Sequence, residues 1–119
     1  MNMLDITTPH DGSKNVTVLV KGILDEELHL TPILLAEKLS GQPKKIKLTE
    51  ALWLVQEKMG IALWWKKDDL IAPMESRNSI RLDRGWDSPK DWGGIILLSS
   101  FNWSPNRKFF TLEVGFDKQ

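Results

Sequence analysis

The chain has 119 residues with 16 basic and 16 acidic side chains, so its formal net charge at pH 7 is zero. This balance weighs against a general nucleic-acid binder, which usually carries a basic excess. The absence of cysteine excludes disulfides, thiolate zinc sites and cysteine nucleophiles, and no stretch approaches the roughly 20 apolar residues that a membrane span needs.

The composition indicates one globular domain. Hydrophobic residues make up 41% and charged residues 27%, the proportions of an ordinary folded protein. Because there is no repeat, low-complexity tract or linker, we expect residues 1–119 to form a single domain, with residues 1–15 as an irregular lead-in. The first residues lack the pattern of a secretory signal, which favours a cytoplasmic location.

Two segments in the N-terminal half carry helix signals. Thr31–Gly41 begins with a favoured N-cap and a proline at the first helical position and ends on a glycine, which predicts a helix of about two turns. Thr49–Gly60 is also bounded by a cap and a glycine, and its apolar residues recur at helical spacing. Trp53 and Leu54 fall outside that apolar face, so they need a second layer, a partner or partial exposure.

Strand signals dominate the rest of the chain. Val16–Lys21 has a strand composition, and Ile61–Trp65 and Asn78–Trp86 alternate. Leu70–Met74 contains Pro73, which restricts it to the edge of a sheet.

The stretch Gly93–Phe116 has the pattern of a long hairpin closed by a four-residue loop around Pro105. That closure pairs Phe101 with Phe110 and gives the two strands a common apolar face. The predicted face consists of Ile95, Leu97, Phe101, Phe110, Leu112, Val114 and Phe116. The expected fold class is therefore α+β: a mainly antiparallel sheet of about four to five strands ending in this hairpin, with two helices packed on one face.

No catalytic, metal-binding or cofactor-binding pattern stands out. His10 and His29 each lack a second histidine nearby, and Asp83, Asp87 and Asp91 lack the spacing of an EF-hand loop. There is no glycine-rich phosphate loop and no nucleophile elbow. We therefore assign no catalytic residue, metal or cofactor, and keep an enzyme as an alternative because an active site can be assembled from distant residues.

The six tryptophans, in a chain without tyrosine, carry the functional prediction. Tryptophan and arginine dominate binding hot spots because they bury a large rigid area. We predict a protein-binding module such as an inhibitor, immunity protein or assembly factor. Its predicted anchors are Trp64, Trp86, Trp92 and Trp103, with Arg81, Arg84 and Lys90 as orienting charges. The same rings are also suited to closing a small core, the role expected of Trp65.

Two alternative partners follow from other features. Residues 44–67 carry six lysines against two acids, so a nucleic acid is a second possible partner. Its phosphates would meet Lys44, Lys45, Lys47, Lys66 and Lys67, and Trp64 would stack on a base. An open sheet edge would also allow a homodimer.

Overall fold

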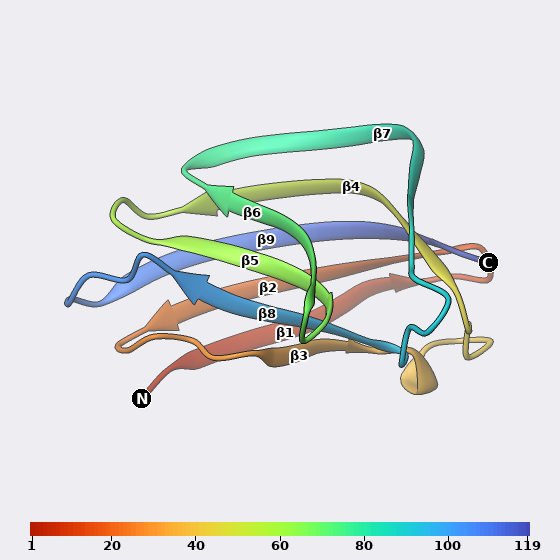
Figure 1. The fold of residues 1–119 in the computed structure, drawn as a ribbon, viewed down its shortest axis with the longest axis horizontal. Helices are drawn as coiled ribbons and strands as arrows, with labels where there is room; N and C mark the ends of the chain where they lie inside the picture. Colours follow the sequence, from red (N-terminus) through yellow and green to blue (C-terminus); the bar gives the residue numbers. More distant parts are fainter.

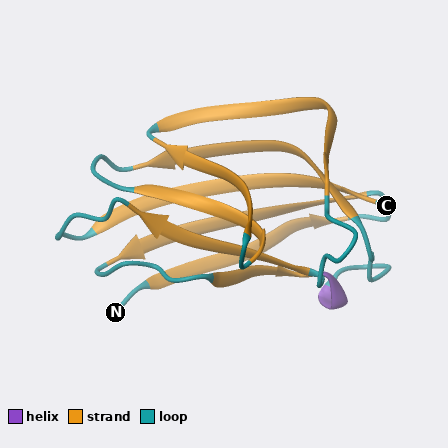
Figure 2. Cartoon of the chain, viewed as in Figure 1, coloured by secondary structure: helices purple, strands orange, loops and turns teal.

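The structure, a computed structural model covering residues 1–119, is a β-sandwich of two antiparallel sheets (Figures 1 and 2). The strands are β1 (Met3–Asp11), β2 (Asn15–Leu24), β3 (Thr31–Leu35), β4 (Ile46–Val55), β5 (Gly60–Lys66), β6 (Asp69–Glu75), β7 (Arg77–Asp87), β8 (Ile95–Phe101) and β9 (Lys108–Lys118). The one helical element is η1 (Ala36–Lys38), a single 3₁₀ turn. No helix is long and apolar enough to cross a membrane.

The strand pairing is nested. Sheet A has the order β1-β2-β9-β4-β7, and sheet B has the order β3-β8-β5-β6. Thus β2 pairs with β9, β3 with β8, β4 with β7 and β5 with β6, each pair lying inside the previous one along the chain. This is one long double-stranded ribbon folded over into two sheets, the connectivity of a jelly roll. β1 is an additional strand at the edge of sheet A.

The core lies between the two sheets and is built by alternation along the strands. In β2 and β9, every second side chain points inward and is almost fully buried. Trp65 of sheet B reaches across to Phe116 of sheet A, with ring centroids 6.4 Å apart, and meets Trp92 edge-on at the same distance. One continuous hydrophobic cluster of 26 residues results.

The α+β prediction is wrong, because neither predicted helix exists. Thr31–Gly41 forms β3 and then η1, and Thr49–Gly60 is divided between β4, a turn and the start of β5. In the part of β4 that was predicted to be helical, Thr49–Val55, the buried residues are Ala51, Trp53 and Val55, which is a period of two. Residues four apart share a face in a strand as well as in a helix, so Ala51 and Val55 fit either pattern. Trp53 distinguishes the strand from the helix: it would lie outside the apolar face of the predicted helix, yet it is only 7% exposed.

The predicted C-terminal hairpin is also wrong. β8 lies between β3 and β5 in sheet B, whereas β9 lies between β2 and β4 in sheet A. The apolar face of β9 was predicted correctly, but that of β8 is inverted: Ile96 and Leu98 are buried and Ile95 is 38% exposed. The short loop brings the strand ends close, and Lys108 Nζ lies 5.9 Å from the ring centre of Trp103. The strands then diverge into different sheets, which the loop length alone does not reveal.

The lead-in prediction for residues 1–15 is wrong as well, since β1 occupies Met3–Asp11. Pro9 is tolerated because β1 is an edge strand, and the pairing of β1 with β2 is irregular between Thr7 and His10. The edge position predicted for Leu70–Met74 is confirmed, because β6 is the outer strand of sheet B.

Candidate functional site

Four of the seven predicted partner-binding residues lie along one edge of sheet A. Arg81, Arg84 and Trp86 belong to β7, and Lys90 follows in the next loop. Arg81 is ion-paired with Glu50 at 3.6 Å, and Trp86 is 44% exposed. Arg81, Arg84 and Trp86 are therefore exposed on an edge strand, and Lys90 is exposed in the loop that follows it.

The other three predicted residues are tryptophans that lie elsewhere. Trp92 is 9% exposed and donates its indole N–H to a backbone carbonyl at 2.9 Å, so it belongs to the core. Trp64 lies on the outer face of sheet B, where its indole N–H donates to Ser99 at 3.0 Å. Trp103 is half-buried beside Lys108. The seven predicted residues therefore do not form one surface.

The lysines of residues 44–67 are partly neutralised. Lys47 pairs with Asp87 at 3.7 Å, and Lys66 is hydrogen-bonded to Asp91, which raises the pKa of the Lys66 amine. Both ion pairs reduce the charge that these lysines offer to phosphate groups. No group of histidine and acidic side chains is placed to hold a metal ion.

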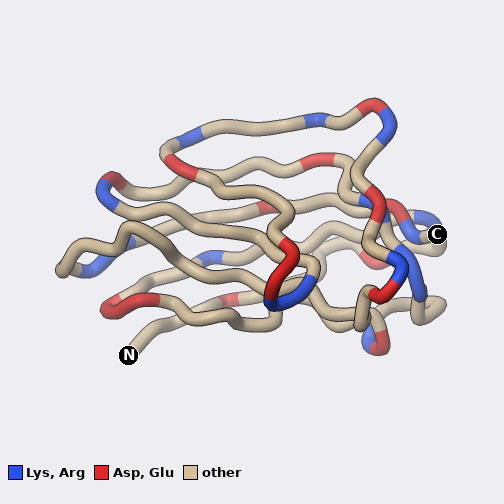
Figure 3. The backbone as a smooth tube through the Cα atoms, in the orientation of Figure 1, with Lys and Arg blue, Asp and Glu red and all other residues tan.

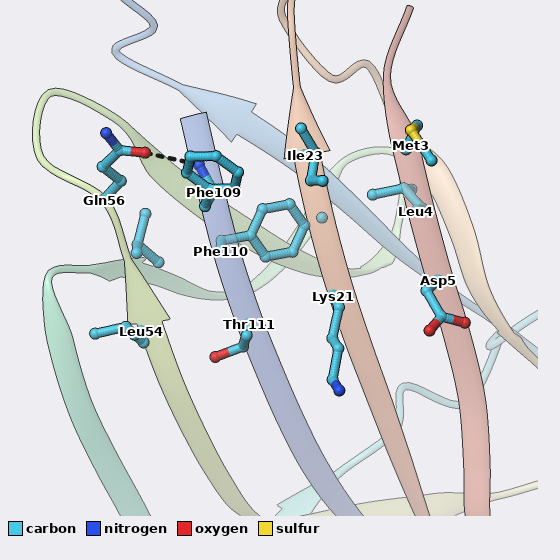
Figure 4. A pocket seen from close by; sticks show the side chains of 12 residues that line it. Met3, Leu4, Asp5, Lys21, Ile23, Leu54, Gln56, Phe109, Phe110 and Thr111 are labelled. Carbon is cyan, nitrogen blue, oxygen red and sulfur yellow. Dashed lines mark hydrogen bonds between the residues drawn. The ribbon is translucent and has the colours of Figure 1, made fainter. Parts of the chain in front are cut away.

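An apolar hollow lies on the outer face of sheet A (Figure 4). Met3, Ile23 and Phe109 form a row across β1, β2 and β9, because Met3 pairs with Ile23 and Ile23 with Phe109. Leu54 of β4 stands in the adjacent row, where it pairs with Thr111. Together with their neighbours these side chains surround a volume of about 540 Å³. We call this surface the sheet A hollow.

The sheet A hollow exposes large apolar side chains. Met3 is 64% exposed, Leu54 and Phe109 are each 52% exposed, and the neighbouring Leu52 is 51% exposed. Scattered single apolar residues are normal on a surface, whereas a contiguous group of this kind makes the surface a candidate interaction site.

Polar groups surround the apolar centre of the hollow. Asp5 of β1 lies opposite Lys21 of β2 in the strand register, so the rim carries one acid and one base. Gln56 accepts the backbone N–H of Phe109 at 2.9 Å and thereby holds the start of β9 against the end of β4. This anchors Phe109 on a fixed part of the sheet.

No tryptophan lines the hollow, although two signals for it are present in the sequence. Phe109 and Phe110 are adjacent, and neighbouring residues of a strand point to opposite faces, so one of the two rings must face outward. Leu54 falls outside the apolar face of the helix predicted for Thr49–Gly60, which indicates an exposed leucine. What the sequence does not show is the strand order that brings Leu54, Phe109 and Met3 together.

No protein-family model, curated protein or solved structure matches the chain significantly. Folds of this kind host unrelated functions, so the fold alone does not indicate what this chain does.

Proposed function

We propose that this protein is a protein-binding module, in the manner of an inhibitor, immunity protein or assembly factor, and that its partner covers the sheet A hollow. The observation that carries the proposal is the clustering of Met3, Leu54 and Phe109, each at least half exposed, around one hollow. A core of apolar side chains surrounded by polar groups is the usual anatomy of a protein interface.

The shape of the hollow favours a protein over a small molecule. Sites for small molecules enclose 70–90% or more of the ligand surface. The lining residues of the sheet A hollow come from strands of one sheet, apart from Gln56 at the end of β4 (Figure 4). The hollow is therefore open to the surface and not enclosed between the two sheets. A partner protein would supply the missing wall with its own apolar side chains.

The expected energetics place Phe109 at the centre. Full burial of a large apolar side chain contributes about 1.5–3 kcal/mol, so covering a half-exposed ring contributes roughly half of that. Phe109 is flanked by Ile23 on one side and by the end of β4 on the other, and its backbone is fixed by Gln56. A held, central aromatic ring is the typical hot spot.

The test compares Phe109→Lys and Leu54→Lys with the control Leu70→Lys, which changes an exposed leucine (46%) on sheet B. Each immobilised variant is used to capture proteins from the native cell extract, which are quantified by mass spectrometry. We expect the proteins retained by the wild type to be lost with the two hollow variants and kept with the control. Circular dichroism verifies that all the variants are folded.

Two results would contradict the proposal. If the folded hollow variants retain the same proteins as the wild type, the hollow is not the binding surface. If Leu70→Lys loses them to the same extent, the loss does not come from the hollow.

A further inference from the structure

The four edge strands of the sandwich are protected unequally. β3 and β6 contain Pro32 and Pro73, and the pairing of β7 with β4 is interrupted between Leu48 and Glu50. β7 also carries several exposed charges. Prolines, bulges and charges are the features by which proteins prevent an edge from pairing with another chain.

β1 lacks this protection over its first half. Met3–Thr7 pairs with β2 without interruption, contains no proline and carries one charge, on Asp5. Eight of the nine residues of β1 are exposed. An edge strand of this kind offers a row of unpaired backbone N–H and C=O groups to a further strand.

A second hollow lies beside this edge, between β1 and β3, which run side by side along the lower side of the sandwich in Figure 1. Its volume is about 490 Å³, and its apolar lining includes Ile6, Ile33 and Leu39. Ile6 pairs with the buried Val20 and points to the core side of sheet A, yet it remains 37% exposed. A strand added next to β1 would direct every second side chain toward this hollow.

The charges at the margin of this second hollow select the partner. Asp11 is already engaged, because it accepts hydrogen bonds from Lys118 Nζ and from the backbone N–H of Ser40. Lys38 is exposed and forms no ion pair. The available charge is therefore positive, and an acidic group is its complement.

We propose that the free edge of β1 binds an extended peptide segment of a partner protein, whose inward-facing side chains are apolar, with an acidic residue opposite Lys38. The segment adds a strand to sheet A, so that backbone hydrogen bonds supply affinity and the second hollow supplies specificity. A second copy of this chain fits less well, because its β1 would place no acid opposite Lys38. The core-side residues of β1 are Leu4, Ile6 and Thr8, whereas Asp5 points to the opposite face. This site is separate from the sheet A hollow and goes beyond the function proposed above.

The test selects from a displayed library of peptides of about ten residues, the length of a long strand. We expect enriched sequences that alternate apolar and polar residues and place an acid among the apolar positions. Bound peptide should protect from hydrogen exchange those backbone amides of Met3–Thr7 that point away from β2. Ile6→Lys should abolish binding, and Lys38→Glu should weaken it by about three- to tenfold. Replacing the acid of the peptide by lysine should restore binding to Lys38→Glu.

The control Phe109→Lys should bind the selected peptide like the wild type, which separates this site from the sheet A hollow. Enriched peptides without the alternating pattern, or binding without protection of Met3–Thr7, would overturn the proposal. A further outcome is that the same amides become protected without peptide as the protein concentration rises. That result would also overturn the proposal, because it would show that a second copy of the chain binds at this edge.

Discussion

Lys118, the last residue of β9, holds three separate segments of the chain together. Its side chain is 6% exposed, and Nζ donates hydrogen bonds to the Asp11 carboxylate and to the backbone carbonyls of Gly12 and Ser40. Asp11 in turn accepts the backbone N–H of Ser40 at 2.8 Å. The hydrogen bond from Lys118 lowers the pKa of Asp11. One ammonium group therefore joins β9, the end of β1 and the loop after η1.

The substitution Lys118→Met tests this junction. It keeps most of the aliphatic stem but removes all three donors, leaving a carboxylate and two carbonyls without their partner. Hydrogen bonds to charged groups contribute about 1.5–3 kcal/mol, so we expect the free energy of unfolding to fall by about 2–3 kcal/mol. Urea unfolding measures this change.

Lys21→Met is the matched control, because Lys21 also lies in a strand of sheet A but is exposed and forms no ion pair. The control should change the free energy of unfolding by at most about 0.5 kcal/mol. Equal losses in the two variants would mean that the junction at Lys118 adds nothing to stability.

At the scale of elements, β2 and β9 illustrate what the sequence reveals. The outward and inward faces of β9 follow from simple alternation, and the strand composition of Val16–Lys21 correctly places β2. β4 fails because its inward residues also satisfy the helical period, and β8 fails because apolar residues occupy both of its faces. Alternation therefore identifies a strand when one face is polar, and loses its power when both faces are apolar.

Gly22 is a position where close contact between two strands requires glycine. It lies inside β2 and pairs with Phe110 of β9. A Cβ atom at this position would lie 2.1 Å from the Phe110 ring, which is 2% exposed and enclosed by the core. The absence of a side chain lets the ring lie against the backbone of the neighbouring strand.

Gly22→Ala should therefore lower the free energy of unfolding by about 1–3 kcal/mol, the usual cost of overpacking a core. Gly93→Ala is the control, because a Cβ atom there meets no atom within 4 Å. Denaturant titration of both variants provides the comparison. If Gly22→Ala is as stable as the control, the Phe110 ring can move aside and the contact is not a constraint.

At the scale of the whole molecule, the nested pairing explains why the site and the fold were difficult to predict. β2 pairs with β9 at the opposite end of the chain, and no local turn rule brings residues 15–24 against residues 108–118. The sheet A hollow depends on the same pairing, since Met3, Phe109 and Leu54 come from β1, β9 and β4, which only the strand order β1-β2-β9-β4 brings together. Individual outward-facing apolar residues can be read from the sequence, whereas their convergence requires the topology.

The nested pairing also predicts that the two sheets unfold together. Each pair of strands, from β2–β9 to β5–β6, lies inside the previous pair along the chain. One hydrophobic cluster joins both sheets, so neither sheet has a core of its own. Trp65 of sheet B packs on Phe116 of sheet A, and its fluorescence reports the separation of the sheets. Because the chain has six tryptophans, the fluorescence of Trp65 is obtained by subtracting the emission of Trp65→Phe from that of the wild type. We expect this signal and far-ultraviolet circular dichroism, which reports the strands, to give the same urea midpoint and one transition. Midpoints that differ beyond error would show that one sheet persists without the other, so that the shared core does not couple them.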